Sequence, residues 1–140
     1  MWILVDTNVY LDYFLDREGA DEAQKFFINC RKTKSKTFVT SMSLRDIEYA
    51  AHKYTHDKAV SKRILASTYE LCSKVIGITE DDAINSIYSD IDDYEDSLIV
   101  EAAKRSMINL IVTNNKKDFQ NSRFPVFTPK EYNEIVERDI

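Results

Sequence analysis

Polar residues that could bind a metal ion follow an apolar run at the start of the chain. Asp6 comes directly after the run from Trp2 to Val5, and Thr7 and Asn8 follow it. A carboxylate without a partner at the end of a buried strand is costly to desolvate, and a bound cation removes that cost. The alternative is that Asp6 caps the next helix. On either interpretation Asp6 stands at a strand-to-helix junction.

Asp96 is a second candidate ligand, at the start of the segment DSLIVEAAKR. Apolar residues recur through this segment at helical spacing, so we expect a helix that begins near Asp96. An acid in the first turn of a helix is favoured by the helix dipole without any metal. Four further acids crowd just before it: Asp90, Asp92, Asp93 and Glu95. This density fits either a solvated loop or an acid that faces a cation.

Two more groups of polar residues are expected at the same place in the fold. One follows the apolar run 110–113 and comprises Thr113, Asn114, Asn115 and Asp118. The other leads into a predicted helix with Asp46 and Glu48, and comprises Thr40, Ser41 and Ser43. Ligands of open parallel sheets bind outside the carboxyl ends of the strands. The sequence therefore predicts that these groups meet Asp6 in one pocket.

The elements that must position these residues alternate in type along the chain. Short apolar runs alternate with longer segments of helical period, which is typical of a parallel α/β sheet flanked by helices. We expect four to five strands, at about 2–5, 37–40, 75–78, 110–113 and 126–127. Helices are expected at about 9–15, 21–31, 43–54, 57–73 and 95–106, with two more starting at Thr79 and Thr128. Thr128, Pro129 and Glu131 form the pattern of a capping box with proline in the first turn.

Length and charge bound the class of protein. The chain has 140 residues, which suits one domain over residues 1–140. Its 19 basic and 24 acidic residues give a net charge of −5, which argues against nucleic-acid binding by a positive field over the whole surface. The basic residues still form two clusters: Arg31, Lys32, Lys34 and Lys36, and Lys58, Lys62 and Arg63. These clusters are either solvated helix ends and loops or contacts to phosphates.

The two cysteines, Cys30 and Cys72, form no CxxC pair and no metal-ligand spacing. We therefore interpret both as reduced core residues of a cytoplasmic protein. The apolar run before Asp6 is too short for a signal peptide, and no stretch is long enough to cross a membrane.

Three segments resemble the PIN-domain family, which includes the VapC-type toxin ribonucleases. They are ILVDTNVYLDYFL, DYEDSLIVEAAKR, and LIVTNNKKDF followed by FPVFTPKEY. Their order and spacing extend the resemblance over nearly the whole chain. The resemblance implies a three-layer fold with a central parallel sheet and a divalent-metal-dependent endoribonuclease, with Mg²⁺ as the cofactor or Mn²⁺ in its place. It also implies an RNA substrate, a homodimer and pairing with an antitoxin protein.

The resemblance also assigns the acids of the site. Asp6 corresponds to the first acid and Asp96 to the third. The second lies in TSMSLRDIEYA, where Asp46 fits the spacing best, Glu48 is the competitor and the family usually has glutamate. Asp118 is the expected fourth acid, because Asn115 stands where many members carry aspartate. The residues expected to hold these carboxylates in place are Thr7, Asn8, Thr113 and Asn115.

Three rival functions remain open from the residues. Glu48, His52 and His56 lie four residues apart and could bind zinc, although their order is not HExxH. A phosphoacceptor domain of the receiver type also has acids at strand ends. A non-catalytic PIN-like module would bind RNA or protein without cutting. Five aromatic side chains could stack on bases or pack against a partner helix, although core and surface packing is the default expectation for most of them: Tyr10, Tyr13, Phe14, Tyr49 and Tyr54. The apolar-rich helices at 9–15 and 43–54 are expected to form a groove or dimer face.

Overall fold

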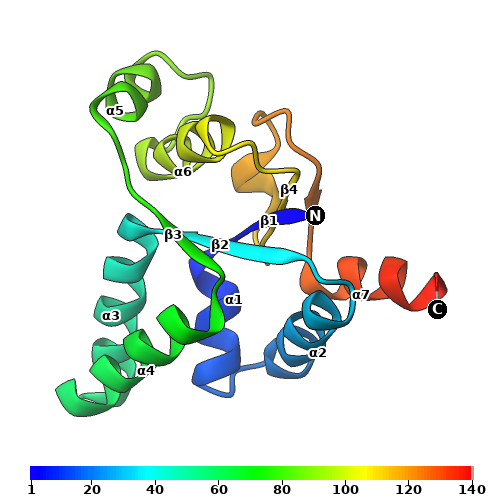
Figure 1. Ribbon diagram of the computed structural model, residues 1–140. Coiled ribbons are helices and arrows are strands. Elements are labelled where there is room, and N and C mark those ends of the chain that lie inside the picture. Colours follow the sequence, from blue (N-terminus) through cyan, green and yellow to red (C-terminus); the bar gives the residue numbers. More distant parts are fainter. Residues whose placement is uncertain (140) are drawn as a thin grey trace.

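The computed structural model describes residues 1–139, so Ile140, the last residue of the predicted domain, lies outside the described part. Within that part, five strands form one parallel sheet in the order β3-β2-β1-β4-β5 (Figure 1). The strands are β1 (Trp2–Val5), β2 (Lys36–Thr40), β3 (Lys74–Ile76), β4 (Leu110–Val112) and β5 (Val126–Phe127). Seven α-helices of the described chain flank this sheet, as the alternating pattern predicts.

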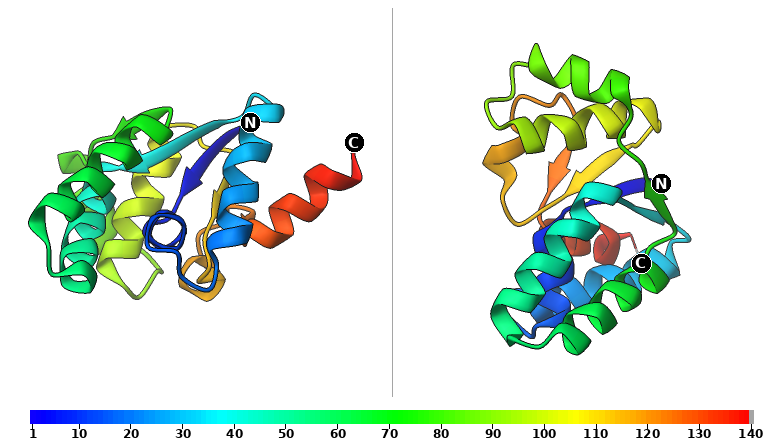
Figure 2. Two further views of the ribbon diagram at one scale, coloured as in Figure 1. Left: turned by 90° about the horizontal axis from the view of Figure 1, so that it is seen from below. Right: turned by 90° about the vertical axis from the view of Figure 1, so that its left-hand side faces the viewer.

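The helices divide between the two faces of the sheet. They are α1 (Thr7–Phe14), α2 (Ala20–Lys32), α3 (Ser41–Thr55), α4 (Lys58–Leu71), α5 (Glu80–Ile87), α6 (Tyr94–Arg105) and α7 (Pro129–Arg138). Figures 1 and 2 show α5 and α6 on one face and the other five helices on the opposite face. The molecule therefore has three layers, with the sheet in the middle.

Strand β1 is buried on both faces, as its uninterrupted apolar sequence predicts. Ile3 and Val5 belong to the core beneath α1, α2 and α3, whereas Leu4 belongs to the core beneath α6. Successive side chains of a strand point to opposite faces, so one short run supplies both cores.

Capping residues define several helix ends where the sequence places them. Thr79 and Thr128 each form a complete capping box, with Asp82 and Glu131 respectively. The 3₁₀ helix η1 (Lys116–Phe119) was not predicted, and the third and fourth strands end two residues and one residue earlier than expected. One turn of 3₁₀ helix is too short to show a hydrophobic period.

Two expectations about single residues are wrong. Tyr10 is fully buried, with its ring 5.4 Å from that of Phe27, so it cannot stack on a base. Cys30 is a buried thiol as expected, but Cys72 is only half-buried. By contrast, Tyr49 and Tyr54 are exposed, as a role at the surface requires. No helix among residues 1–139 has the length and apolar character needed to span a membrane.

The strand order rules out the receiver alternative. A receiver domain has the flavodoxin-like order 2-1-3-4-5, in which the first strand lies between the second and the third. Here β1 lies between β2 and β4. From β1 the chain adds β2 and β3 on one side and β4 and β5 on the other, so the strand order reverses between β1 and β4. A ligand site is expected at such a switch point.

Candidate functional site at the switch point of the sheet

Asp6 stands at the point where the strand order reverses. Its backbone N–H donates to the carbonyl of Val112, which ends β4, at 3.0 Å. One carboxylate oxygen, Oδ1, accepts from the backbone N–H of Thr7 at 2.8 Å, so Asp6 is the N-cap of α1. The capping role and the functional role are therefore compatible, because the cap occupies only one of the two carboxylate oxygens.

The second oxygen of Asp6 is held by residues from two strand ends. Oδ2 accepts from the hydroxyl of Thr113 at 2.8 Å and from the side-chain amide of Asn8 at 3.3 Å. Asn8 in turn accepts from the backbone N–H of Asn114 at 3.2 Å. The polar groups after β1 and β4 thus form one hydrogen-bond network, and this network fixes the direction of the Asp6 carboxylate.

Asp96 lies in the first turn of α6, whose N-cap is Asp93. The Asp93 carboxylate accepts from the backbone N–H of Asp96 at 3.0 Å. Asp96 and Asp93 line a cavity of about 150 Å³ together with Asp118 and Lys117. Asp93 therefore both caps α6 and lines the cavity with Asp96. Asp6 is not among the residues that line this cavity, so the cavity does not bring together all the acids expected in one pocket.

Asp118 reaches this cavity from η1. Its Oδ2 accepts from the side-chain amide of Asn115 at 2.7 Å. The backbone N–H of Asn115 donates to the Thr113 hydroxyl at 3.0 Å, which links Asp118 to the network around Asp6. Asn115 therefore holds the neighbouring carboxylate.

The carboxylates of the site influence one another. Burial raises the pKa of Asp6, hydrogen bonds from Thr113 and Thr7 oppose the rise, and the charges of Asp118 and Asp46 add to it. Burial also raises the pKa of Asp96, to about 7, with further contributions from Asp93, Asp118, Asp6 and Glu95. Negative charges that raise each other's pKa values in this way create a potential that favours a cation.

Asp46 and Glu48 face different neighbours on α3. Asp46 is half-buried, and its charge acts on Asp6. Burial raises the pKa of Asp46, and an ion pair with Arg45 at 3.3 Å opposes the rise. Glu48 instead accepts from the hydroxyl of Ser61 on α4, also at 3.3 Å. Residues two apart on a helix point about 200° apart, so both cannot reach one ion.

Asp12 belongs to the edge of the site and was not expected from the sequence. Its Oδ2 accepts from the side-chain amide of Asn114 at 2.6 Å, and its Oδ1 pairs with Arg17 at 2.8 Å. The sequence spacing could have indicated this position, because Asn8 and Asp12 are four residues apart and share a helix face. Asp12 thus ties the loop after β4 to α1.

The donor chemistry of the site fits magnesium. Its candidate ligands are all carboxylate oxygens, and Mg²⁺ prefers oxygen donors. Among residues 1–139, no three Asp, Glu, His or Cys side chains lie close enough together to hold one ion. Mg²⁺ keeps several waters and often needs only one or two carboxylates from the protein, so the site still suits it.

The zinc alternative fails on the same geometry. Glu48, His52 and His56 form no such group in the described chain. His56 lies beyond the last residue of α3 as its C-cap, in the left-handed conformation with φ 56°, so it does not continue the helical spacing of Glu48 and His52.

The fold and the site together define a class of α/β proteins with acids at the switch point of a parallel sheet. The chain belongs to the PIN domain family, whose model matches residues 2–117. No curated protein matches its sequence.

Three solved structures are similar to the chain over most of its length. A toxin–antitoxin complex from Klebsiella pneumoniae has a TM-score of 0.63 and 22% identity, over 91% of this chain and 97% of that one. VapBC2 from Rickettsia felis, bound to a DNA fragment from its promoter, has a TM-score of 0.69 and 16% identity, over 90% and 97%. FitAB bound to an IR36 DNA fragment has a TM-score of 0.67 and 15% identity, over 91% and 94%. At these identities the similarity shows the fold alone.

Proposed function

We propose that the chain is a Mg²⁺-dependent endoribonuclease, one PIN-like domain over residues 1–140, with Mn²⁺ as an alternative metal. The observation that carries this proposal is the fixed, partly buried carboxylate of Asp6 at the switch point, whose pKa is raised chiefly by burial and further by the charges of Asp118 and Asp46. Family membership supports the reaction class, because characterised PIN domains are mostly metal-dependent ribonucleases.

In this proposal Asp6 and Asp96 are the principal ligands. A bound metal ion supplies an activated water and stabilises charge on the phosphate. Thr113 and Asn8 hold the Asp6 carboxylate in one orientation, and Asn115 does the same for Asp118. Such fixed carboxylates lose little freedom when they bind a cation, which favours affinity.

We assign the second acid to Asp46 and the fourth to Asp118. The charge of Asp46 acts on Asp6, whereas Glu48 is hydrogen-bonded to α4. Asp118 lines the same cavity as Asp96 and raises its pKa. A non-catalytic PIN-like module is the alternative function, and the ion pair of Asp46 with Arg45 favours it, because this pair competes with metal binding.

The partners proposed for the chain follow from its neighbours in structure. Two of the three are toxin–antitoxin or VapBC complexes, so we propose that this chain is the toxin of such a pair, acts as a homodimer and binds an antitoxin protein. Cys30 and Cys72 are free thiols, which supports the proposal of a cytoplasmic location.

Cleavage assays with matched variants test the proposed activity. We expect Mg²⁺-dependent cleavage of RNA by the wild type, and a loss of at least about 10²-fold in Asp6→Asn and in Asp96→Asn, because each removes a charged metal ligand. Asp81→Asn is the control, since Asp81 is an exposed first-turn acid of α5, as Asp96 is a first-turn acid of α6. Circular dichroism checks that each variant is folded.

Two outcomes would contradict the nuclease proposal. Binding of RNA without cleavage at any divalent metal concentration would indicate the non-catalytic module. Cleavage that is equally fast in Asp6→Asn and in the Asp81→Asn control would place the reaction elsewhere.

A further inference from the structure

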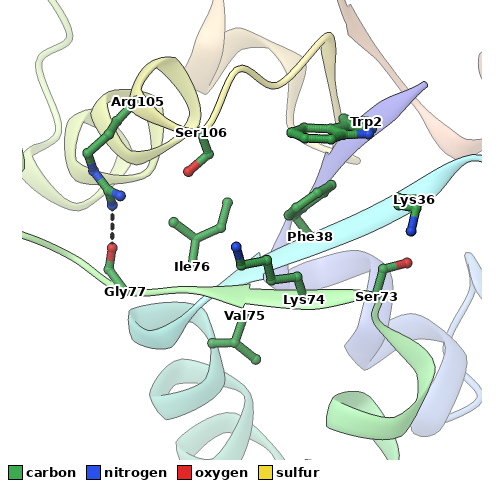
Figure 3. A pocket seen from close by; sticks show the side chains of 10 residues that line it. All are labelled: Trp2, Lys36, Phe38, Ser73, Lys74, Val75, Ile76, Gly77, Arg105 and Ser106. Atoms are coloured by element: carbon green, nitrogen blue, oxygen red, sulfur yellow. Dashed lines mark hydrogen bonds between the residues drawn. The ribbon is translucent and has the colours of Figure 1, made fainter.

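A second cavity is lined by residues from the starts of β1 and β2 and from the whole length of the edge strand β3, and none of the acids of the candidate metal site lines it. It has a volume of about 530 Å³, and Figure 3 shows the side chains that line it. Trp2 begins β1 and Asp6 follows the same strand, so about 13 Å of extended chain separates the two. The cavity is therefore distinct from the carboxylate site.

The parallel register explains why aromatic and cationic side chains meet in this cavity. Trp2 is paired with Lys36 across β1 and β2, and Phe38 is paired with Lys74 across β2 and β3. Residues paired in a sheet point to the same face, so each aromatic ring lies beside a lysine. Ile76, from β3, lies on this face as well and packs in the same core as Phe38 (Figure 3).

The floor of the cavity is a pair of aromatic rings. The rings of Trp2 and Phe38 have centroids 5.3 Å apart, at an angle of 41°. Phe38 is buried, but Trp2 remains 43% exposed. An exposed indole that packs against a buried ring offers a planar surface on which a base can stack.

The rim of the cavity is positively charged, although the chain as a whole is acidic. In the described chain neither Lys36 nor Lys74 has a carboxylate within ion-pair distance. None of the ten lining residues is acidic. The strand and residue spacings put the two Cα atoms ~8 Å apart, close enough for both ammonium groups to reach one phosphate.

Arg105 forms a fixed wall of the cavity. Its guanidinium donates to the carbonyl of Gly77 (Figure 3). It also pairs with the buried Asp82 at 2.9 Å. Asp82 compensates the charge of Arg105, so the uncompensated charges at this site are the two lysines.

We propose that this cavity binds a nucleotide unit, with the base stacked on Trp2 and the phosphate between Lys36 and Lys74. The ligand is either a free nucleotide or one nucleotide of an RNA chain. An acidic peptide would satisfy the lysines as well, but the exposed planar indole favours a base. The proposal does not depend on nuclease activity, because it involves none of the acids at the switch point.

The fluorescence of Trp2 tests the proposal directly, because Trp2 is the single tryptophan of the sequence. We expect adenosine monophosphate to quench this emission saturably, with half-saturation below about 1 mM, which corresponds to about −4 kcal/mol. Inorganic phosphate should not quench it, since phosphate has no ring. Adenosine should quench it more weakly than the nucleotide.

A pair of charge-reversed double variants provides the matched control. We expect Lys36→Glu with Lys74→Glu to weaken nucleotide binding at least tenfold. Lys53→Glu with Lys130→Glu makes the same change in net charge on exposed residues of α3 and α7, outside both basic clusters, and should leave the affinity within twofold. The thermal midpoints of both variants check that they are folded.

A hexa-adenylate RNA distinguishes the two sources of the nucleotide. This arm uses the Asp6→Asn background, so that cleavage does not interfere. Tighter binding of the hexamer than of the mononucleotide, lost on reversal of Lys36 and Lys74, indicates an RNA-binding site. Equal affinities indicate a free nucleotide.

Three outcomes would overturn the proposal. One is the absence of quenching by either adenine ligand in folded wild-type protein. A second is equal weakening of binding by the two double variants. The third is saturable quenching by an acidic Asp- and Phe-containing hexapeptide in place of the nucleotide, which would assign the cavity to a peptide. A failure of RNA cleavage alone would leave nucleotide binding intact, so the two proposals are tested separately.

Discussion

At the scale of single residues, Asp6 shows how a helix cap also becomes a candidate metal ligand. Oδ1 accepts from the first backbone N–H of α1, and Oδ2 accepts from Thr113 and Asn8. The cap fixes the rotamer, and the two side chains fix the remaining oxygen. The charge is thereby held at the carboxyl ends of β1 and β4, and Asp6 forms no ion pair with any residue from 1 to 139.

Thr113 is predicted to position Asp6 and not to bind the metal itself. Thr113→Val has nearly the same shape but removes the hydroxyl that donates to Asp6 Oδ2, so we expect apparent Mg²⁺ affinity to fall about 10–100-fold. Metal titration of the cleavage rate measures this, and Thr113→Ser should restore most of the affinity. A Thr113→Val variant that titrates with Mg²⁺ as the wild type does would remove this role.

The assignment of the second acid is tested by a pair of variants on α3. Asp46→Asn should reduce cleavage by about tenfold or more, because its charge acts on Asp6. Glu48→Gln should retain cleavage and lose about 1 kcal/mol of stability at most, through its contact with Ser61. Cleavage rates and denaturant unfolding separate the two effects, and the reverse pattern would identify Glu48 as the second acid.

At the scale of elements, α6 connects the two ends of the sheet. Its first turn carries Asp96, which lines the acidic cavity, and its last residue, Arg105, lines the cavity beside Trp2. The bond from Arg105 to Asp82 also fastens α6 to α5. The position of Asp96 therefore depends on packing that is remote from the candidate metal site.

The Asp82–Arg105 pair gives a prediction of pH-dependent stability. Burial alone would raise the pKa of Asp82, but hydrogen bonds from Arg105 and Thr79 outweigh it and lower the pKa below 3.8. The folded state therefore binds this proton less readily than the unfolded state. The stabilisation is present above the unfolded pKa, near 4, and is lost as the pH falls through the lower folded value.

Asp82→Asn should reduce the free energy of unfolding by about 1–3 kcal/mol at pH 7, because it leaves the Arg105 guanidinium without its anion. The difference from the wild type should shrink as the pH falls below 4. Denaturant unfolding at several pH values measures both effects. Glu137→Gln removes the exposed pair with Lys25 and should change stability by less than about 0.5 kcal/mol. A constant difference between Asp82→Asn and wild type from pH 7 to pH 3 would contradict the assignment.

At the scale of the whole molecule, the acids of the site oppose folding until a cation neutralises them. Folding raises the pKa of Asp96 to about 7, chiefly through burial and then through neighbouring acids. Such a group binds its proton more tightly when folded, so the metal-free protein should lose stability as the pH rises from about 4 to about 7. The pH dependence of stability expected from Asp96 is therefore opposite in direction to that expected from Asp82.

Thermal unfolding should show directly that the charged acids destabilise the metal-free protein. Metal-free wild type should melt at a lower temperature at pH 8 than at pH 5.5, and Asp96→Asn should reduce that difference. At pH 8, Mg²⁺ at one hundred times its dissociation constant should add about 2.7 kcal/mol of stability. The added stability should be smaller at pH 5.5, where protonation of Asp96 competes with the metal. Equal stabilisation of wild type and Asp96→Asn by Mg²⁺ would show that Asp96 is not a ligand.

The sequence by itself determined the layers and several element ends. The apolar run of β1 required burial on both faces, and local capping patterns at Thr79 and Thr128 marked two helix starts. It also placed Asp6 at a strand end, because a charge that directly follows four apolar residues can stand only at the edge of the buried sheet. These features depend on neighbours in sequence, so local physical rules suffice for them.

The tertiary structure alone decided which distant residues act together. Asp46 and Glu48 have almost the same sequence context, and only the packing of α3 against α4 turns Glu48 to Ser61. Asn115 was expected near the acids, but its bond to Asp118 depends on the unpredicted turn η1. Trp2 and Lys74 are 72 positions apart in the sequence, and the parallel register brings them to one cavity. Strand register is set by long-range packing, so no local pattern could have revealed that cavity.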